Sequence, residues 1–310
     1  MGLIGLGLNG LHFARALGFN SLLAEIILFY GFFALALVSL PYFYHLIKEK
    51  IGISEQMHLL KEWQDPFQIT LFPAVTLTFL LFFLSLWQLY YWQEAYLWGY
   101  LGVLLAHTVL FLRMVSRWLF DARIELSHLK PTWFILLSGN FVAVISGLTL
   151  LPESWQEGLW FYFSVSIFIW LTLVFSLFYR LIFIQPITLK MRPTLFIFLA
   201  PPSLGTVASL LLLPNDQPSF LTWAFYSFAT LMLLIWLFAI MHFRNSELSM
   251  VSWAYVYPLA AYGLASQYMA EALHAPFLWV WSSVLFLVTL GFVILISTWL
   301  IKQIPKGNGV

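Results

Sequence analysis

The stretch FLTWAFYSFATLMLLIWLFAIMHF, residues 220–243, holds no aspartate, glutamate, lysine or arginine. A helix of about 20 apolar residues is long enough to cross the hydrocarbon core of a bilayer. Unpaired backbone groups are too costly in lipid, so a crossing segment must be a helix or part of a closed barrel. The alternation of apolar and polar residues that is typical of a membrane barrel strand is missing here. The stretch therefore predicts a transmembrane helix.

Similar apolar segments fill almost all of the 310-residue chain. The composition is 62% hydrophobic and 9% charged, whereas soluble domains carry roughly 25% charged residues. A soluble fold of this composition would expose more apolar surface than water tolerates. We predict an all-α integral membrane protein of one domain, residues 1–310, with ten transmembrane helices. Their predicted positions are 2–19, 23–47, 68–88, 93–117, 131–150, 158–184, 193–213, 219–243, 250–271 and 276–301.

Lysine and arginine are distributed unevenly along the chain. All but one of the 14 basic residues lie in the connections after the second, fourth, sixth and eighth segments, at the adjoining helix ends or near the C-terminus. The exception is Arg15. Because cytoplasmic connections are enriched in lysine and arginine, this distribution predicts that both termini lie in the cytoplasm. The residues concerned are Lys48, Lys50, Lys61, Arg113, Arg117, Arg123, Lys130, Arg180, Lys190, Arg192, Arg244, Lys302 and Lys306.

The composition and the motifs exclude several classes of function. A net charge of +1 leaves no basic surface for nucleic acid, and the lack of cysteine excludes disulfides and thiolate chemistry. GLGLNG at residues 5–10 matches G-x-G-x-x-G, but no strand precedes it, as a dinucleotide site requires. No histidines have metal-ligand spacing with a third donor nearby, and no intramembrane carboxylates are paired. We therefore predict no cofactor, no metal site and no enzymatic activity.

Helix breakers alternate along the chain. Glycine or proline interrupts the odd-numbered segments, whereas the fourth, sixth, eighth and tenth have no interior proline. Interruptions are tolerated where protein or water satisfies the freed carbonyls. We predict that the odd-numbered helices surround a central pathway and that the even-numbered ones face lipid. Close packing of small residues between helices is the alternative explanation. The residues predicted to line the pathway are Gly5, Gly7, Gly10, Ser138, Asn140, Ser203 and Thr206.

Ionisable residues inside the predicted helices are candidates for function, because charge in lipid is costly. These residues are His12, Arg15 and His107. For His107 we favour a hydrogen-bonded structural role. Arg15 has three interpretations: pairing with Glu25 across the first hairpin, reaching to lipid headgroups, or attracting anions at the outer mouth of a pore.

Four local patterns fall in odd-numbered helices. They are GLGLNGL at 5–11, PTWFI at 131–135 leading into Gly139 and Asn140, APP at 200–202, and WAYVYP at 253–258. Together with ten helices, they resemble the tellurite-resistance/dicarboxylate transporter family. That family includes the slow anion channels of plant guard cells and their bacterial homologues, and the resemblance covers nearly the whole chain.

The resemblance implies a homotrimer in a bacterial cytoplasmic membrane. In each protomer, five helical hairpins would surround a pore lined by the odd-numbered helices. It also implies that a phenylalanine of the ninth helix occludes the pore, and Tyr257 occupies that position here. Pro258 leaves the carbonyl of Ala254 without its helical donor, which predicts a bend beside the tyrosine ring. A phenol can also donate a hydrogen bond to an anion.

These features predict a passive channel for small inorganic anions such as chloride or nitrate, gated by Tyr257. A weakly polar pore favours anions that lose their water easily. The alternative is a proton-coupled or exchange carrier for dicarboxylate, sulfite or tellurite-type oxyanions. Such a carrier needs a titratable group in the lumen, and His12 is the candidate. A membrane scaffold without transport activity is a third and weaker interpretation. The expected partners are small anions and lipid.

Overall fold

The structure, a computed structural model, describes residues 1–50, 68–90, 93–213, 217–244 and 248–303. Every regular element in these ranges is a helix, and no strand occurs among them. Lys61 and Lys306, which contributed to the predicted orientation, lie outside the described residues.

Eight helical stretches of the described part are long and apolar enough to cross a membrane, so the chain is a multi-pass membrane protein. The predicted segments 2–19 and 250–271 are not among them. Helix α1, Gly2–Leu17, has 16 residues, and α12, Val256–Leu273, carries Gln267, Glu271 and several tyrosines. The eight stretches are Leu22–Leu40, Ile69–Leu89, Glu94–Phe120, Pro131–Leu150, Glu153–Phe183, Leu189–Leu212, Phe220–Phe238 and Pro276–Gln303.

The long helices form two layers, and within the described part the inner layer is a closed ring. Each inner helix contacts the next one, and α12 returns to contact α1. Each inner helix also packs against the long helix that follows it in sequence, so the chain is a succession of helical hairpins. The inner helices are α1, α4 (Phe72–Leu89), α6 (Phe134–Leu150), α9 (Ala200–Leu212) and α12. The outer helices are α2 (Leu22–Lys50), α5 (Gln93–Phe120), α8 (Leu159–Phe183), α10 (Phe220–Phe238) and α13 (Pro276–Gln303).

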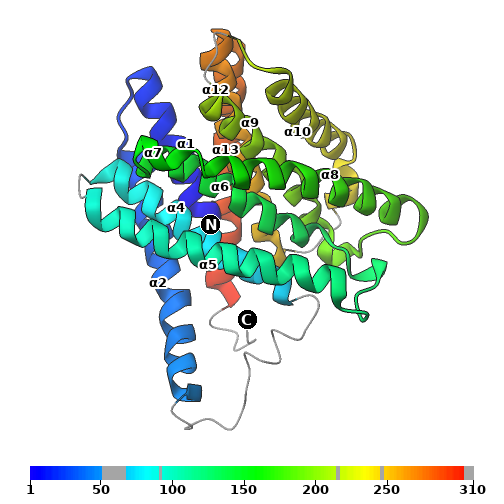
Figure 1. The fold of residues 1–310 in the computed structure, drawn as a ribbon. Coiled ribbons are helices and arrows are strands. Elements are labelled where there is room, and N and C mark those ends of the chain that lie inside the picture. Colours follow the sequence, from blue (N-terminus) through cyan, green and yellow to red (C-terminus); the bar gives the residue numbers. More distant parts are fainter. Residues whose placement is uncertain (51–67, 91–92, 214–216, 245–247, 304–310) are drawn as a thin grey trace.

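Burial separates the two layers clearly. The most apolar window of the stretch Pro131–Leu150, which contains α6, is 89% buried, and that of Leu189–Leu212, which contains α9, is 78% buried. The corresponding windows of α5 and α13 are 17% and 22% buried. Figure 1 shows α5, α8 and α10 running along the outside of the molecule, with α6 and α9 between them. The apolar side chains exposed on the outer helices are the surface expected to contact lipid.

Four of the inner helices are entered through a 3-10 segment. The prolines that the sequence analysis assigned to kinks lie at these entrances, where the missing N–H has no helical partner to lose. Where a bend was predicted beside the ring of Tyr257, the structure has a change of helix type, because α12 begins at Val256 directly after η5. The 3-10 segments are η1 (Gln68–Leu71), η3 (Pro131–Trp133), η4 (Leu189–Leu199) and η5 (Met250–Tyr255).

Short elements complete the described chain. The predicted segment 219–243 is interrupted, because α10 ends at Phe238 and a separate helix α11, Ile240–Arg244, follows. After α5, the carboxylate of Asp121 accepts hydrogen bonds from Arg123 and Arg117. These guanidinium groups, Arg123 above all, lower the pKa of Asp121. The remaining short elements are η2 (Leu126–His128) and α7 (Glu153–Gln156).

Buried hydroxyl groups join the two layers. Ser209 of α9 donates to Thr222 of α10 over 2.9 Å. Thr230 of α10 and Tyr262 of α12 lie 2.7 Å apart through their oxygens. Such interhelical hydrogen bonds in lipid contribute roughly 0.6–2 kcal/mol each. They explain part of the polar content of the inner helices without reference to a pathway.

Candidate functional site

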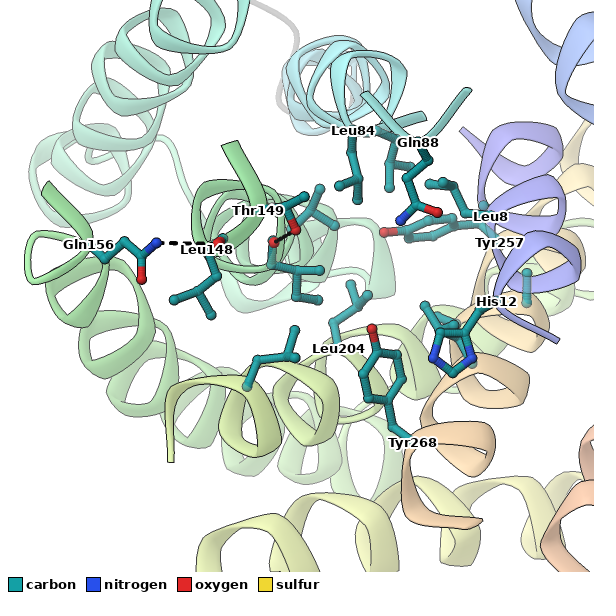
Figure 2. Close-up of a pocket in the computed structure, with 18 residues that line it drawn as sticks. Leu8, His12, Leu84, Gln88, Leu148, Thr149, Gln156, Leu204, Tyr257 and Tyr268 are labelled. Atoms are coloured by element: carbon teal, nitrogen blue, oxygen red, sulfur yellow. Dashed lines mark hydrogen bonds between the residues drawn. The ribbon is translucent and has the colours of Figure 1, made fainter. Parts of the chain in front are cut away.

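The ring of inner helices encloses a cavity of about 290 Å³. All of these helices contribute to its wall, and α7 adds Gln156 (Figure 2). Most of the wall is leucine, valine, isoleucine and alanine. Its polar or ionisable side chains are His12, Gln88, Thr149, Gln156, Tyr257 and Tyr268.

The cavity extends along the axis of α1. Gly5 and Tyr257 lie at one end, and His12 is two turns further along α1. At 1.5 Å per residue, His12 is roughly 10 Å from Gly5 along the helix. Gln88 lies in the last turn of α4, and Tyr268 in the second half of α12. A narrow apolar passage with a few polar groups can hold a small ion that has lost part of its water.

Tyr257 is the bulky group at the Gly5 end. Its side chain is buried, with 4% exposure. A Cβ atom on Gly5 would lie 3.2 Å from Cδ2 of the tyrosine ring, so the glycine leaves the space in which the ring packs. The hydroxyl of Tyr257 has no hydrogen-bond partner among the described residues. Figure 2 shows the ring extending into the cavity from α12.

Gly7 and Gly10 face the neighbouring helices. A Cβ on Gly7 would lie 2.5 Å from Cγ of Leu28 in α2. A Cβ on Gly10 would lie 2.9 Å from Cβ of Ala24 in the same helix and 3.1 Å from the ring of Phe286. These two glycines let α1 approach α2 and α13 closely, whereas Gly5 lines the cavity.

The small polar residues of α6 and α9 are engaged elsewhere. Ser138 donates to the carbonyl of Phe134 over 3.0 Å. The hydroxyl of Ser203 donates to the carbonyl of Leu199 at the end of η4, and that of Thr206 donates to the carbonyl of Pro202 in α9. Apart from Thr149, the part of the cavity wall that these helices supply is made by apolar residues that the sequence analysis did not select, because leucine facing a lumen and leucine facing lipid look alike. These include Val142, Ile145, Leu148, Leu204 and Leu211.

His107 is fully buried between α4, α5 and α6. Its Nδ1 lies 2.8 Å from the hydroxyl of Thr76, and its Nε2 lies 2.9 Å from Oδ1 of Asn140. A Cβ on Gly139 would lie 2.3 Å from Cε1 of the imidazole, so the glycine makes room for the ring. Asn140 thus faces His107, and both ring nitrogens have partners, as a structural histidine requires.

Arg15 binds Gln88 rather than Glu25. Its Nη1 donates to Oε1 of Gln88 over 2.7 Å, and its Nη2 donates to the Gln88 carbonyl over 2.6 Å. Glu25 accepts a hydrogen bond from the hydroxyl of Ser21. The hairpin pair with Glu25 therefore does not form, and the guanidinium lies beside a residue of the cavity wall.

His12 lies on the cavity wall among polar groups of α12. Its Nδ1 is 3.0 Å from Oε1 of Gln267, and its Nε2 is 3.6 Å from Oε2 of Glu271. The ring of Tyr268 stacks on the imidazole with centroids 4.4 Å apart. The contacts with Gln267 and Glu271 join residues that are more than 250 positions apart in sequence.

Comparison with known proteins adds an independent finding. The profile of a family described as voltage-dependent anion channel, SLAC1, matches residues 1–301. The uncharacterized transporter MJ0576 of Methanocaldococcus jannaschii is 30% identical over 178 residues, which cover 51% of this chain and 50% of that protein. The S-type anion channel SLAH2 of Arabidopsis thaliana is 26% identical over 162 residues, which cover 51% of this chain and 30% of that protein. The aligned region thus spans half or less of the length of these relatives.

Proposed function

The chain belongs to the voltage-dependent anion channel family, and from this premise we propose that it conducts small inorganic anions, such as chloride and nitrate, through the cavity inside its ring of helices. The match confirms the resemblance to the tellurite-resistance/dicarboxylate transporter family. This is a family of channels and transporters rather than of enzymes. The driving force for the anions is the electrochemical gradient.

The observation that carries the proposal is the cavity wall. It is largely apolar, and its polar groups are mostly neutral hydrogen-bond donors and acceptors such as Gln88, Thr149 and Gln156. An ion in such a passage loses much of its water without gaining a fixed countercharge. Monovalent anions that dehydrate easily are therefore the favoured substrates.

We assign the gate to Tyr257 and Pro258. The ring fills the cavity at the Gly5 end, and a dry constriction blocks ions without any charge. Pro258 stands in the first turn of α12, so it holds the start of the helix directly behind the ring. Of the residues predicted to line the pathway, Gly5 faces the gate. The others support the helices around the cavity through the contacts described above; they are Gly7, Gly10, Ser138, Asn140, Ser203 and Thr206.

At the opposite end of the cavity, Arg15 supplies the attraction for anions. Its guanidinium carries a positive charge beside Gln88, and a charge at a pore mouth raises the local concentration of counter-ions.

We further propose ten membrane crossings in one domain, residues 1–310, with both termini in the cytoplasm and three protomers in the assembly. In this arrangement α1 and α12 cross as the short inner members of their hairpins.

A second candidate function is a proton-coupled carrier for dicarboxylate, sulfite or tellurite-type oxyanions. The observation that favours it is the titratable side chain of His12 on the cavity wall. A channel passes current at equal pH on both sides, whereas a coupled carrier needs a proton gradient.

Substitution of Tyr257 by alanine tests the gate. Without the ring the passage rewets, and anion current in reconstituted bilayers should rise on the order of tenfold or more. Tyr257→Phe keeps the ring, so it should conduct like the parent in total. If the hydroxyl contacts the anion, the phenylalanine variant should change the ratio of chloride to nitrate permeability.

Tyr179→Ala is the matched control, because this tyrosine of α8 is 55% exposed on the outer layer and should leave the current unchanged. The assignment of the gate to Tyr257 is wrong if the Tyr257→Ala protein folds and assembles like the parent but conducts no more anions. Flux that appears only with a proton gradient would support the carrier instead.

A further inference from the structure

We propose that His12 is a proton-binding site inside the anion cavity, and that the bound proton increases the occupancy of the cavity by monovalent anions. The inference rests on the proposed function, because it takes the cavity as the path of the anion. It is carried by the contacts of five side chains, namely Asn9 and His12 of α1 and Gln267, Tyr268 and Glu271 of α12.

The tautomer of His12 follows from one backbone carbonyl. The carbonyl of Ala260 can only accept, and Nδ2 of Asn9 donates to it over 2.8 Å. Oδ1 of Asn9 therefore accepts from Nε2 of Gln267, also over 2.8 Å. Gln267 is left with its Oε1 towards Nδ1 of His12, 3.0 Å away. Because an amide oxygen has no hydrogen to give, Nδ1 must carry one.

The proton-binding atom is consequently Nε2. In the neutral ring only one nitrogen carries hydrogen, so Nε2 presents a lone pair. Oε2 of Glu271 lies 3.6 Å from it, and the ionised carboxylate is also an acceptor. Two acceptors that face each other repel, and a proton on Nε2 converts them into an ion pair. The stacked ring of Tyr268 presents its face to the resulting cation.

Two charged groups act on His12 with opposite signs. The carboxylate of Glu271, 3.6 Å from Nε2, attracts a proton there, and the positive guanidinium of Arg15 on the same helix opposes it. Arg15 is held by Gln88 of α4, a helix without an ionisable side chain. Tyrosines aside, the other ionisable residues on the packed helices are Glu25, His45, Lys48, Glu49 and Lys50 of α2, His274 at the end of α12, and Lys302 at the end of α13.

Protonation changes the charge at this end of the cavity by one unit. With neutral His12, the carboxylate of Glu271 repels an approaching anion. With protonated His12, the pair is neutral and Arg15 attracts the anion without opposition. A unit charge at about 7 Å in water changes the local anion concentration about threefold, and the effect is larger where water is excluded.

The test is anion current in planar bilayers, with acid added only on the side where Glu271 lies. As the pH is lowered stepwise from about 8, the chloride current of the parent and of Tyr257→Ala should rise about threefold, because the imidazole of His12 gains a charge. His12→Gln should abolish the rise. His274→Gln, which changes the neighbouring exposed histidine, should retain it.

Glu271→Gln gives a second readout. It removes the repulsion, so the current near pH 8 should increase, and the remaining acid response should move to lower pH because the carboxylate no longer favours the proton. An acid response of unchanged size and midpoint in His12→Gln overturns the proposal. A pH-independent current in both the parent and Tyr257→Ala does so too.

Nuclear magnetic resonance of ¹⁵N-labelled histidine tests the site without any current. At high pH His12 should show the tautomer with hydrogen on Nδ1, and acid should protonate Nε2. A neutral ring with hydrogen on Nε2 contradicts the proposal even if a variant fails to fold. If neither the parent nor Tyr257→Ala passes anions at any pH, the proposed function fails, whereas current that ignores pH refutes only the role of His12.

Discussion

The charge of Arg15 and its position have separable effects. The guanidinium donates to both the side-chain oxygen and the carbonyl of Gln88. Because Oε1 of Gln88 is occupied in this way, its NH₂ group is the part left free to face the cavity (Figure 2). Arg15 therefore acts on an anion both directly through its charge and indirectly by orienting a neutral donor.

Two substitutions of Arg15 distinguish these effects. Arg15→Gln should lower single-channel conductance about two- to threefold at low salt and less at high salt, because screening weakens the attraction of anions. Arg15→Lys keeps the charge but not the two-pronged contact with Gln88. If charge alone matters, the lysine variant should conduct like the parent across ionic strengths. If Arg15→Gln conducts like the parent at every salt concentration, Arg15 does not attract anions at the mouth of the pore.

At the scale of elements, the effect of a glycine depends on what its helix face meets. In α1, Gly7 lies where a side chain would collide with Leu28 of α2. Because glycine has no Cβ, the two helices can pack at this short distance. In α5, Gly102 faces open space, with nothing within 4 Å of a Cβ. Gly7 thus brings two helices together, whereas Gly102 only weakens the helix that carries it.

Gly7→Ala and Gly102→Ala form a matched pair of substitutions. Gly7→Ala should destabilise the fold by about 1–3 kcal/mol, because the added methyl overpacks against Leu28. Gly102→Ala should be neutral or stabilise by up to about 1 kcal/mol, because alanine favours the helix. Thermal unfolding in detergent measures both as shifts in Tm. A Gly7→Ala protein that is as stable as Gly102→Ala would contradict the packing of α1 on α2.

For the whole molecule, the connections between helices divide by charge. Arg123 and Lys130 follow α5, and Lys190 lies at the start of η4 after α8, whereas Glu94 in the first turn of α5 and Glu157 after α7 have no basic residue beside them. This division predicts that α5, α6 and α8 each cross the membrane, and Arg244 before α12 with Lys302 at the end of α13 predicts that α12 and α13 cross as a pair. The number of crossings and the orientation are therefore tested together.

Single cysteines provide that test, because the natural chain contains none. Cysteine at Lys130 or Lys190 should react with a membrane-impermeant maleimide only after the cells are opened. Cysteine at Glu94 or Glu157 should react in intact cells. Measuring labelling before and after permeabilisation gives the side directly. One clear reversal among the four positions would exclude ten crossings with cytoplasmic termini.

The candidate site was predictable from the sequence only in part. Tyr257 and Gly5 stand in distinctive motifs, and the structure brings them together. His12 was recognisable as an ionisable residue in an apolar segment. The partners Gln88 and Gln267 carried no signal, since a glutamine near the end of a membrane helix has many ordinary roles. The apolar lining residues, such as Leu204, carried none either.

Three properties could be predicted from the sequence without the fold: the chain lies in a membrane, it is helical, and its odd-numbered segments differ from the rest. Composition decides these properties, because lipid excludes charge and requires paired backbone groups wherever the segments go. The face of each inner helix that meets the cavity becomes known only from the folded arrangement. That rotation depends on individual contacts, such as Asn9 with Gln267 or Gly7 with Leu28. These contacts join separate helices, and no local pattern records them.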